Sequence, residues 1–201
     1  MMAKSLEPII QGEPASTSVS SKPVFEGEGF GVEGKVVQAA IALGGNLGDS
    51  QKILSEAIQV VDSHEAMRVT ARSHLYKTAP VGPPQPDYLN ACILIETTLT
   101  PRSLLQQLLA IETQFGRVRQ ARWGARSLDL DLLLFGDEIV DTPGLTVPHP
   151  RLHERPFVLV PLVDIAPDWQ HPIFGKTMDH LLAQLRVTGV ERLATPPSRF
   201  P

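Results

Sequence analysis

Two aspartates separated by one residue, Asp129 and Asp131, lie in a short aliphatic run that follows a basic turn. Glycines at Gly124 and Gly136 bound this run, which favours a strand over a helix. Alternate residues of a strand face the same way, so the two carboxylates should project side by side, with Leu130 on the opposite face. Adjacent carboxylates repel each other and are costly to desolvate, so the fold must offset that cost.

A bound divalent cation would offset it. Hard oxygen ligands suit magnesium, which keeps several waters and is shared with substrate phosphates. The phosphate partners would be four nearby arginines, whose guanidinium groups bind phosphate oxygens in a fork: Arg117, Arg119, Arg122 and Arg126. The alternative is a structural ion pair in which Arg126 bridges to Asp129 or Asp131. A basic cluster on a chain of net charge −4 suits a small polyanion better than a long nucleic acid.

The composition is that of one globular domain. The chain has 201 residues, of which 42% are hydrophobic and 20% charged. We expect a disordered N-terminal tail over residues 1–34, a folded domain over 35–194 and a frayed tail over 195–201. The single cysteine, Cys92, excludes an internal disulfide. Without a hydrophobic signal core or an apolar stretch of about 18 residues, we expect a cytoplasmic protein that binds no membrane.

Hydrophobic periodicity predicts an α+β fold. The predicted strands are residues 36–43, 67–77, 91–98 and 128–135, and the predicted helices are 50–63, 101–115, 156–163 and 177–186. A short extended piece is expected at 138–140. The glycine-rich turn before the first helix is interpreted as a turn with Asp49 or Ser50 as its cap. The order indicates a ferredoxin-like βαββαβ sandwich with helices on one face and extra C-terminal helices.

Several motifs carry a resemblance to a known family. Arg-Trp-Gly-Ala-Arg-Ser-Leu-Asp-Leu-Asp-Leu-Leu, at residues 122–133, resembles the signature of 6-hydroxymethyl-7,8-dihydropterin pyrophosphokinase, an enzyme of folate synthesis. Four more regions resemble the family in the same order, at residues 42–48, 76–90, 112–119 and 147–155. The resemblance implies transfer of the β,γ-pyrophosphoryl group of ATP to the pterin hydroxymethyl group, with release of AMP. It also implies the ferredoxin-like fold.

The resemblance implies roles for the charged residues. Asp129 and Asp131 would hold two Mg²⁺ ions that bridge the triphosphate of the co-substrate ATP. Arg117, Arg119 and Arg126 are the expected catalytic arginines. Asp129 is not assigned as a general base, because a carboxylate bound to a metal is a weak base.

Substrate contacts also follow from the resemblance. Phe157 is the expected stacking ring for the pterin, with Trp123 or Tyr88 on its other side, because a flat heteroaromatic needs stacking partners. Its edge would be read by Asn90 and by residues Thr78, Ala79, Pro80 and Val81. The expected ATP contacts are Glu112, Arg119, Arg122, Trp123, Arg126, Leu132, Thr146, His149 and Arg155.

Two other functions remain open from the sequence. A different two-metal phosphoryl or nucleotidyl transferase would also use the aspartate pair, but it would not need Tyr88, Asn90 and Phe157. A non-catalytic ferredoxin-like binding module would present aromatic residues on its strands and a net basic domain, unlike this chain. We expect a monomer that acts on small molecules and binds no nucleic acid.

Overall fold

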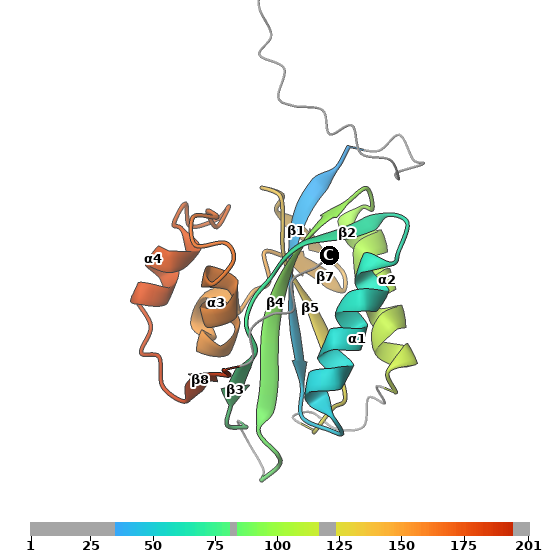
Figure 1. Cartoon of the computed structure of the whole chain (residues 1–201). Coiled ribbons are helices and arrows are strands. Elements are labelled where there is room, and N and C mark those ends of the chain that lie inside the picture. Colours follow the sequence, from blue (N-terminus) through green and yellow to red (C-terminus); the bar gives the residue numbers. More distant parts are fainter. Residues whose placement is uncertain (1–34, 81–83, 117–123, 195–201) are drawn as a thin grey trace, which may run out of the picture.

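The computed structural model of the chain describes residues 35–80, 84–116 and 124–194. Over these ranges the chain forms a six-stranded sheet, a separate two-stranded hairpin and helices on both faces of the sheet (Figure 1). The tails predicted at 1–34 and 195–201 lie outside the described residues. Within the described ranges, no helix has both the length and the apolar character needed to cross a bilayer.

The elements follow the predicted order. The first part comprises β1 (Val37–Gly45), α1 (Ser50–Asp62), β2 (Met67–Arg72), β3 (Tyr76–Thr78), β4 (Tyr88–Thr97), α2 (Pro101–Gln114) and β5 (Asp129–Phe135). The second part comprises β6 (Val140–Thr142), β7 (Leu145–Val147), the 3-10 helix η1 (Leu152–Glu154), α3 (Pro156–Val163), α4 (Met178–Ala183) and β8 (Val190–Arg192). Both predicted start signals are confirmed: Asp49 caps α1 and Thr100 caps α2, where Pro101 opens the first turn.

The strand predicted at 67–77 is wrong as a single element, because the chain leaves the sheet between β2 and β3. The break is held by Ser73. Its hydroxyl accepts a hydrogen bond from the Cys92 backbone N–H at 2.9 Å, and its backbone N–H donates to the Cys92 carbonyl. A side chain thus takes the place of one ladder bond, and β3 begins as a separate strand.

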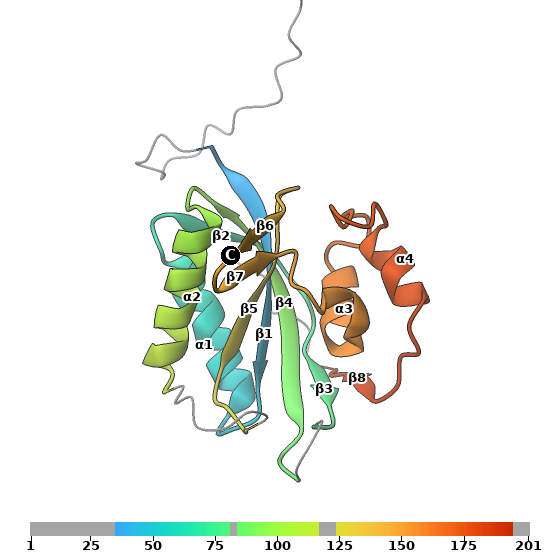
Figure 2. The same ribbon diagram turned by 180° about the vertical axis from the view of Figure 1, so that it is seen from behind.

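The main sheet has the strand order β5-β1-β4-β3-β8, and β2 also pairs with β4 (Figure 2). Each of these pairs is antiparallel. The long central strands β1 and β4 pair along nine positions, from Val37 opposite Thr97 to Gly45 opposite Leu89. The mixed α and β fold with an antiparallel sheet confirms the coarse fold prediction.

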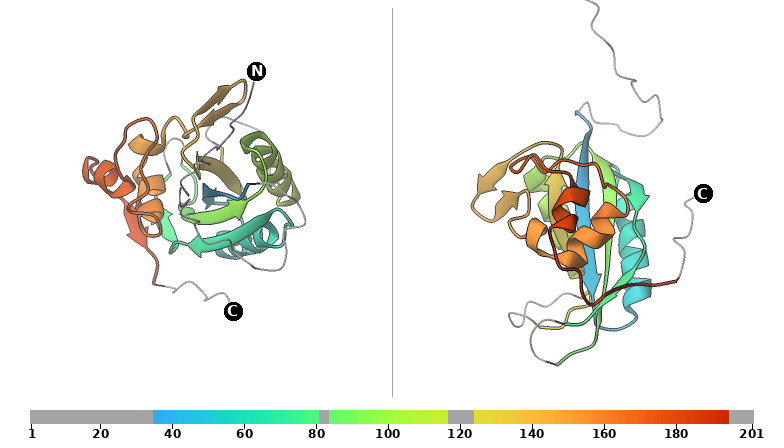
Figure 3. Two further views of the ribbon diagram at one scale, coloured as in Figure 1. Left: turned by 90° about the horizontal axis from the view of Figure 1, so that it is seen from above. Right: turned by 90° about the vertical axis from the view of Figure 1, so that its left-hand side faces the viewer.

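Helices cover both faces of the sheet, which corrects the expectation of one covered face. Side chains such as Leu54, Leu108 and Leu130 form a core between the sheet and α1 and α2. A second core, containing Leu133 and Leu159, lies beneath α3 and α4 on the other face. The left view of Figure 3 looks along the strands and shows the sheet between the two helix layers. The sequence of α3 could not predict which face of the sheet the helix covers, because the helix is apolar on all sides.

Candidate active site

Strand β5 places Asp129 and Asp131 on the face of the sheet that α3 and α4 cover. Asp129 lies opposite Gly44 of β1, and Asp131 lies opposite Ala42. Leu130 is buried on the other face against α1 and α2. The predicted alternation is therefore confirmed. The carboxylates keep 24% and 38% of their side-chain surface exposed, so a polar ligand can reach both.

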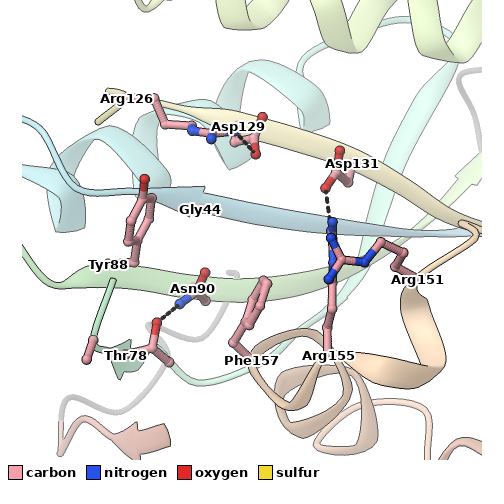
Figure 4. Close-up of a pocket in the computed structure, with 11 residues that line it drawn as sticks. Gly44, Thr78, Tyr88, Asn90, Arg126, Asp129, Asp131, Arg151, Arg155 and Phe157 are labelled. Carbon is pink, nitrogen blue, oxygen red and sulfur yellow. Dashed lines mark hydrogen bonds and ion pairs between the residues drawn. The ribbon is translucent and has the colours of Figure 1, made fainter. Parts of the chain in front are cut away.

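The two aspartates lie in a pocket built by β1, β3, β4, β5 and the segment that leads into α3 (Figure 4). Its lining combines acidic, basic, amide and aromatic side chains: Gly44, Thr78, Ala79, Tyr88, Asn90, Arg126, Asp129, Asp131, Arg151, Arg155 and Phe157. A pocket with one aromatic wall and a few convergent polar groups is typical of a site for a flat polar ligand.

Asn90 gives one wall of the pocket a fixed hydrogen-bonding group. It is buried, and its Nδ2 donates to the Thr78 hydroxyl oxygen at 2.8 Å. Gly44 lies directly across from it in the β1–β4 ladder, and a Cβ added at Gly44 would lie 3.2 Å from Asn90 Oδ1. Thr78 therefore orients the amide, and the absence of a side chain at Gly44 leaves room for the amide oxygen.

Arg126 forms an ion pair with Asp129, with 2.6 Å between its terminal nitrogen and Oδ2. The ion pair that the sequence left open as an alternative is thus present in this structure. Burial disfavours the charged guanidinium, but Asp129 and Tyr88 together outweigh this effect and raise the pKa of Arg126. Arg126 lines the pocket in its charged state, so a phosphate group could compete for it.

The backbone at Arg126 is held by Asn46, a buried side chain in the turn between β1 and α1. The Asn46 oxygen accepts the Arg126 backbone N–H at 2.9 Å, and its amide nitrogen donates to Gln85 and to the Pro86 carbonyl, both at 3.0 Å. Tyr88 adds a link between the same regions, because its hydroxyl lies 3.3 Å from the Gly124 carbonyl. Three segments distant in sequence therefore meet at Asn46.

Asp131 faces two basic side chains, His149 and Arg155, from the chain segment before α3. Arg155 approaches its Oδ2 to 3.7 Å, and His149 Nε2 lies 4.0 Å away. Burial lowers the pKa of both His149 and Arg155, while the negative charge of Asp131 acts in the opposite direction. His149 Nδ1 accepts the Arg151 backbone N–H at 3.1 Å, so a neutral His149 carries its proton on Nε2, toward Asp131.

A second cavity opens on the other side of Asp131. Its lining comes from α2, β5, the β6–β7 hairpin and the segment after it: Leu105, Leu130, Asp131, Leu132, Gly144, Leu145, Thr146, His149 and Pro150. Four leucines give this cavity an apolar part, and Thr146 and His149 add polar groups. Asp131 is the residue that lines both this cavity and the pocket described above.

Comparison with known proteins identifies the family of this chain. Residues 40–167 match the model of the family described as 7,8-dihydro-6-hydroxymethylpterin-pyrophosphokinase (HPPK). This chain belongs to that family. A 2-amino-4-hydroxy-6-hydroxymethyldihydropteridine pyrophosphokinase from Synechocystis is 47% identical over 76% of this chain and 78% of the relative. The enzyme of that name from Pseudomonas aeruginosa is 44% identical over 76% of this chain and 94% of the relative.

A solved structure of the same fold is Plasmodium falciparum HPPK-DHPS wild type. It has a TM-score of 0.62 at 16% identity, over 77% of this chain and 42% of that chain. At that identity the likeness concerns the fold alone. Together with the sequence relatives, it supports the mixed α and β architecture of the pyrophosphokinase family.

The structure brings together many of the residues that we predicted for a pyrophosphokinase site. The pocket contains Thr78, Ala79, Tyr88, Asn90, Arg126, Asp129, Asp131, Arg155 and Phe157, and the second cavity contains Leu132, Thr146 and His149. Pro80 does not line either cavity. Val81, Arg117, Arg119, Arg122 and Trp123 lie outside the described residues, so their predicted roles stay predictions.

Glu112 was predicted to contact ATP, but it is buried and lines neither cavity. It is 2% exposed, and its carboxylate accepts the Leu130 backbone N–H at 2.7 Å. Among the residues that the structure describes, strand β5 is at the edge of the sheet, so this N–H has no neighbouring strand on that side. Glu112 therefore attaches α2 to the strand that carries the aspartates.

Sequence reasoning missed Gly44, Asn46 and Arg151. Arg151 belongs to the segment that already suggested nucleotide binding, so its charge was a usable signal. Asn46 was one polar residue in a glycine-rich turn, and its three distant partners are visible only in the fold.

The aspartate pair fits magnesium by its chemistry. Two partly exposed carboxylates on one strand face offer the hard oxygen ligands that Mg²⁺ prefers. Among the residues that the structure describes, no group of three or more His, Cys, Asp and Glu side chains could hold a metal ion. Such a site would leave the remaining positions to water and substrate phosphates, as magnesium sites in phosphoryl-transfer enzymes usually do.

Proposed function

We propose that this chain transfers the pyrophosphoryl group of ATP to 6-hydroxymethyl-7,8-dihydropterin across the Asp129–Asp131 strand. The chain is an ATP-dependent diphosphotransferase of folate biosynthesis, in keeping with its family. The observation that carries the proposed arrangement is the position of Asp131, which lines both the pocket and the neighbouring cavity. Two substrates placed in these two spaces would meet at the aspartates.

The pterin is assigned to the pocket. Phe157 and Tyr88 would supply the aromatic surfaces for a flat ring, and Asn90 would read its hydrogen-bonding edge. Because Asn90 Nδ2 is already bound to Thr78, its oxygen is the atom that faces a ligand. This placement directs the hydroxymethyl group toward Asp129 and Asp131.

ATP is assigned to the second cavity. The adenosine part would lie against the apolar wall that includes Leu132, with Thr146 as a polar neighbour. The triphosphate would then extend past His149 to the arginines at the pocket, Arg126 and Arg155. Guanidinium groups in this position neutralise the developing charge of the transferred group.

Asp129 and Asp131 would together hold two Mg²⁺ ions with the triphosphate. When bound, these ions supply charge neutralisation and orient the β-phosphorus for in-line attack by the pterin hydroxyl. The residues of the chain position the two substrates and exclude water from the space between them. Asp129 is not proposed as the base, because its carboxylate is engaged by Arg126 in this structure and by the metal in the loaded site.

We also propose the finer description of the fold as ferredoxin-like, which the strand order β5-β1-β4-β2 supports. The proposed pyrophosphokinase domain spans residues 35–194. The expectations of a monomeric, cytoplasmic protein that binds neither nucleic acid nor membrane remain predictions. Family membership favours this function over a nucleotidyl transferase and over a non-catalytic binding module.

The nucleotide product tests the function. The chain is incubated with ATP, magnesium and 6-hydroxymethyl-7,8-dihydropterin, and the products are separated by chromatography. We expect AMP, and only when the pterin is present. ADP would indicate a simple kinase and would refute pyrophosphoryl transfer, whereas a product that retains the nucleotidyl group would indicate a nucleotidyl transferase.

A further inference from the structure

A network of charged side chains joins three elements behind the pterin pocket. Asp164, which follows α3, accepts the His74 backbone N–H at 2.8 Å, and its Oδ2 lies 2.6 Å from His74 Nδ1. On the other side of the imidazole, a terminal nitrogen of Arg192 lies 2.6 Å from His74 Nε2. His74 precedes β3, and Arg192 ends β8. The network thus runs from α3 through the β2–β3 connection to the C-terminal strand.

The network assigns one tautomer to His74. The Asp164 carboxylate can only accept hydrogen bonds, so His74 Nδ1 carries the proton that it shares with Asp164. His74 Nε2 then accepts the hydrogen bond from Arg192. Burial acts to raise the pKa of Asp164, but the hydrogen bonds from His74 and the nearby charge of Arg192 together outweigh it, and the pKa of this carboxyl is lowered. The three side chains therefore form a continuous chain of satisfied donors and acceptors.

The elements that this network joins carry two walls of the pocket. Strand β3 ends at Thr78, whose hydroxyl orients Asn90. Helix α3 begins at Pro156 and Phe157, so the expected stacking ring is in its first turn. The distance between these walls depends on how α3 sits against β3.

Backbone pairing alone supports these elements weakly. Strands β3 and β8 are three residues long and pair with each other at three positions, including Thr78 with Val190 and Tyr76 with Arg192. Strand β3 also pairs with β4 at three positions, but β8 is the edge strand and has no second strand partner among the described residues, so backbone pairing holds β8 weakly. Residues of β8 also lie beyond the region 40–167 that matches the family model. The apolar core beneath α3 packs the helix on β4, and the charged network adds a polar side-chain link between the end of α3 and this edge.

We propose that His74, Asp164 and Arg192 are positioning residues for the pterin, acting through β3 and α3. This inference rests on the proposed assignment of the pterin to the pocket. None of the three lines the pocket or the second cavity. The second cavity is built by α2, β5, the β6–β7 hairpin and the segment after it, and none of the three side chains lines it. Arg155, at the start of α3, is the one proposed ATP contact next to the network, so loss of the network should weaken pterin binding more than nucleotide binding.

Binding measurements on two variants test this inference. Asp164→Asn keeps the size of the side chain but removes its charge, and Arg192→Gln removes the guanidinium. Arg192→Lys retains a cationic donor and should rescue part of the effect. The matched control is Arg68→Gln, which removes an arginine that pairs with Glu96 between β2 and β4, away from the pocket. Calorimetry would give the Kd of 6-hydroxymethyl-7,8-dihydropterin and, separately, of a non-hydrolysable ATP analogue with magnesium.

The expected result is a Kd for the pterin that rises about tenfold in both variants, roughly the loss of one charge-assisted hydrogen bond. The Kd for the ATP analogue should rise by a smaller factor, because only Arg155 among its proposed contacts adjoins α3, and Arg68→Gln should leave both constants unchanged. Unchanged pterin binding in folded variants would overturn the inference. An equal loss of both ligands would also overturn it, since it would show a general structural role. If the wild-type chain failed to bind the pterin, the proposed function itself would be refuted.

Discussion

Asp131 and Arg155 face each other at the junction of the two cavities, with 3.7 Å between the carboxylate oxygen and the guanidinium nitrogen. Arg155 also lies over the Phe157 ring, with its guanidinium carbon 5.7 Å from the ring centroid. One arginine thus contacts both the proposed metal ligand and the proposed stacking ring. This arrangement couples the phosphate side of the site to the pterin side.

Asp131→Asn should lower kcat by more than about a hundredfold, because removal even of groups outside the first metal shell costs 10–100-fold. The fold should remain intact, since the change relieves repulsion from Asp129 and keeps the size of the side chain. Steady-state kinetics at saturating magnesium would measure the effect. Asp137→Asn, in the exposed turn after β5, is the matched control and should retain full activity. An active Asp131→Asn variant would contradict the metal assignment.

Gly44→Ala should weaken pterin binding selectively. The new Cβ would lie 3.2 Å from Asn90 Oδ1, the atom proposed to meet the pterin, and Asn90 cannot move freely because Thr78 holds it. We expect the KM for the pterin to rise about tenfold, comparable to a displaced buried hydrogen bond, with the KM for ATP unchanged. Gly116→Ala serves as a contrast, because nothing lies within 4 Å of its added Cβ although its φ of +74° is strained. If ATP affinity fell in parallel, the assignment of the pocket would be wrong.

Arg102→Ala should weaken ATP binding instead. Arg102 donates from α2 to the Thr142 hydroxyl at 2.7 Å and to the Pro143 carbonyl at 3.0 Å. These bonds hold the turn of the β6–β7 hairpin, which carries Thr146 and other residues of the second cavity. Because the bonds are exposed, we expect a rise of only about threefold in the KM for ATP. Arg102→Lys should recover part of it, and a change confined to the pterin KM would contradict the prediction.

Stability should depend on pH through His171. Its side chain is 2% exposed, and Nδ1 accepts the backbone N–H groups of Ile173 and Phe174 at 3.2 and 3.4 Å. Burial, and after it the charge of His153, lower the pKa of His171 from its usual 6.5. Because the folded pKa is the lower one, the stabilisation is complete above pH 6.5 and is lost as the pH falls toward the folded pKa.

Chemical unfolding between pH 7 and 5 measures this dependence. The contribution of one histidine has a slope of at most about 1.4 kcal/mol per pH unit. His171→Asn keeps an acceptor that does not titrate, so its unfolding free energy should lose this part of the slope. Asp164 titrates in a lower window, below 3.8, so the two contributions separate. An identical slope in His171→Asn and the wild type would contradict the prediction.

Local patterns in the sequence were sufficient for the elements that depend on neighbouring residues. The alternation from Asp129 to Asp131 predicted their common face, and Pro101 predicted the start of α2. Tertiary contacts determined the remaining features. Ser73 divides one predicted strand because its partner, Cys92, lies on another strand. Glu112 looked like a ligand contact until the structure placed it beneath the unpaired edge of β5.

The central claim is that the pterin and ATP occupy the two cavities on either side of Asp131. A crystal structure with 6-hydroxymethyl-7,8-dihydropterin, a non-hydrolysable ATP analogue and magnesium tests it most directly. We expect the pterin ring against Phe157 with its edge at Asn90, the nucleoside beside Thr146, and magnesium on Asp129 and Asp131. Exchanged substrate positions, or magnesium bound to other residues, would contradict it.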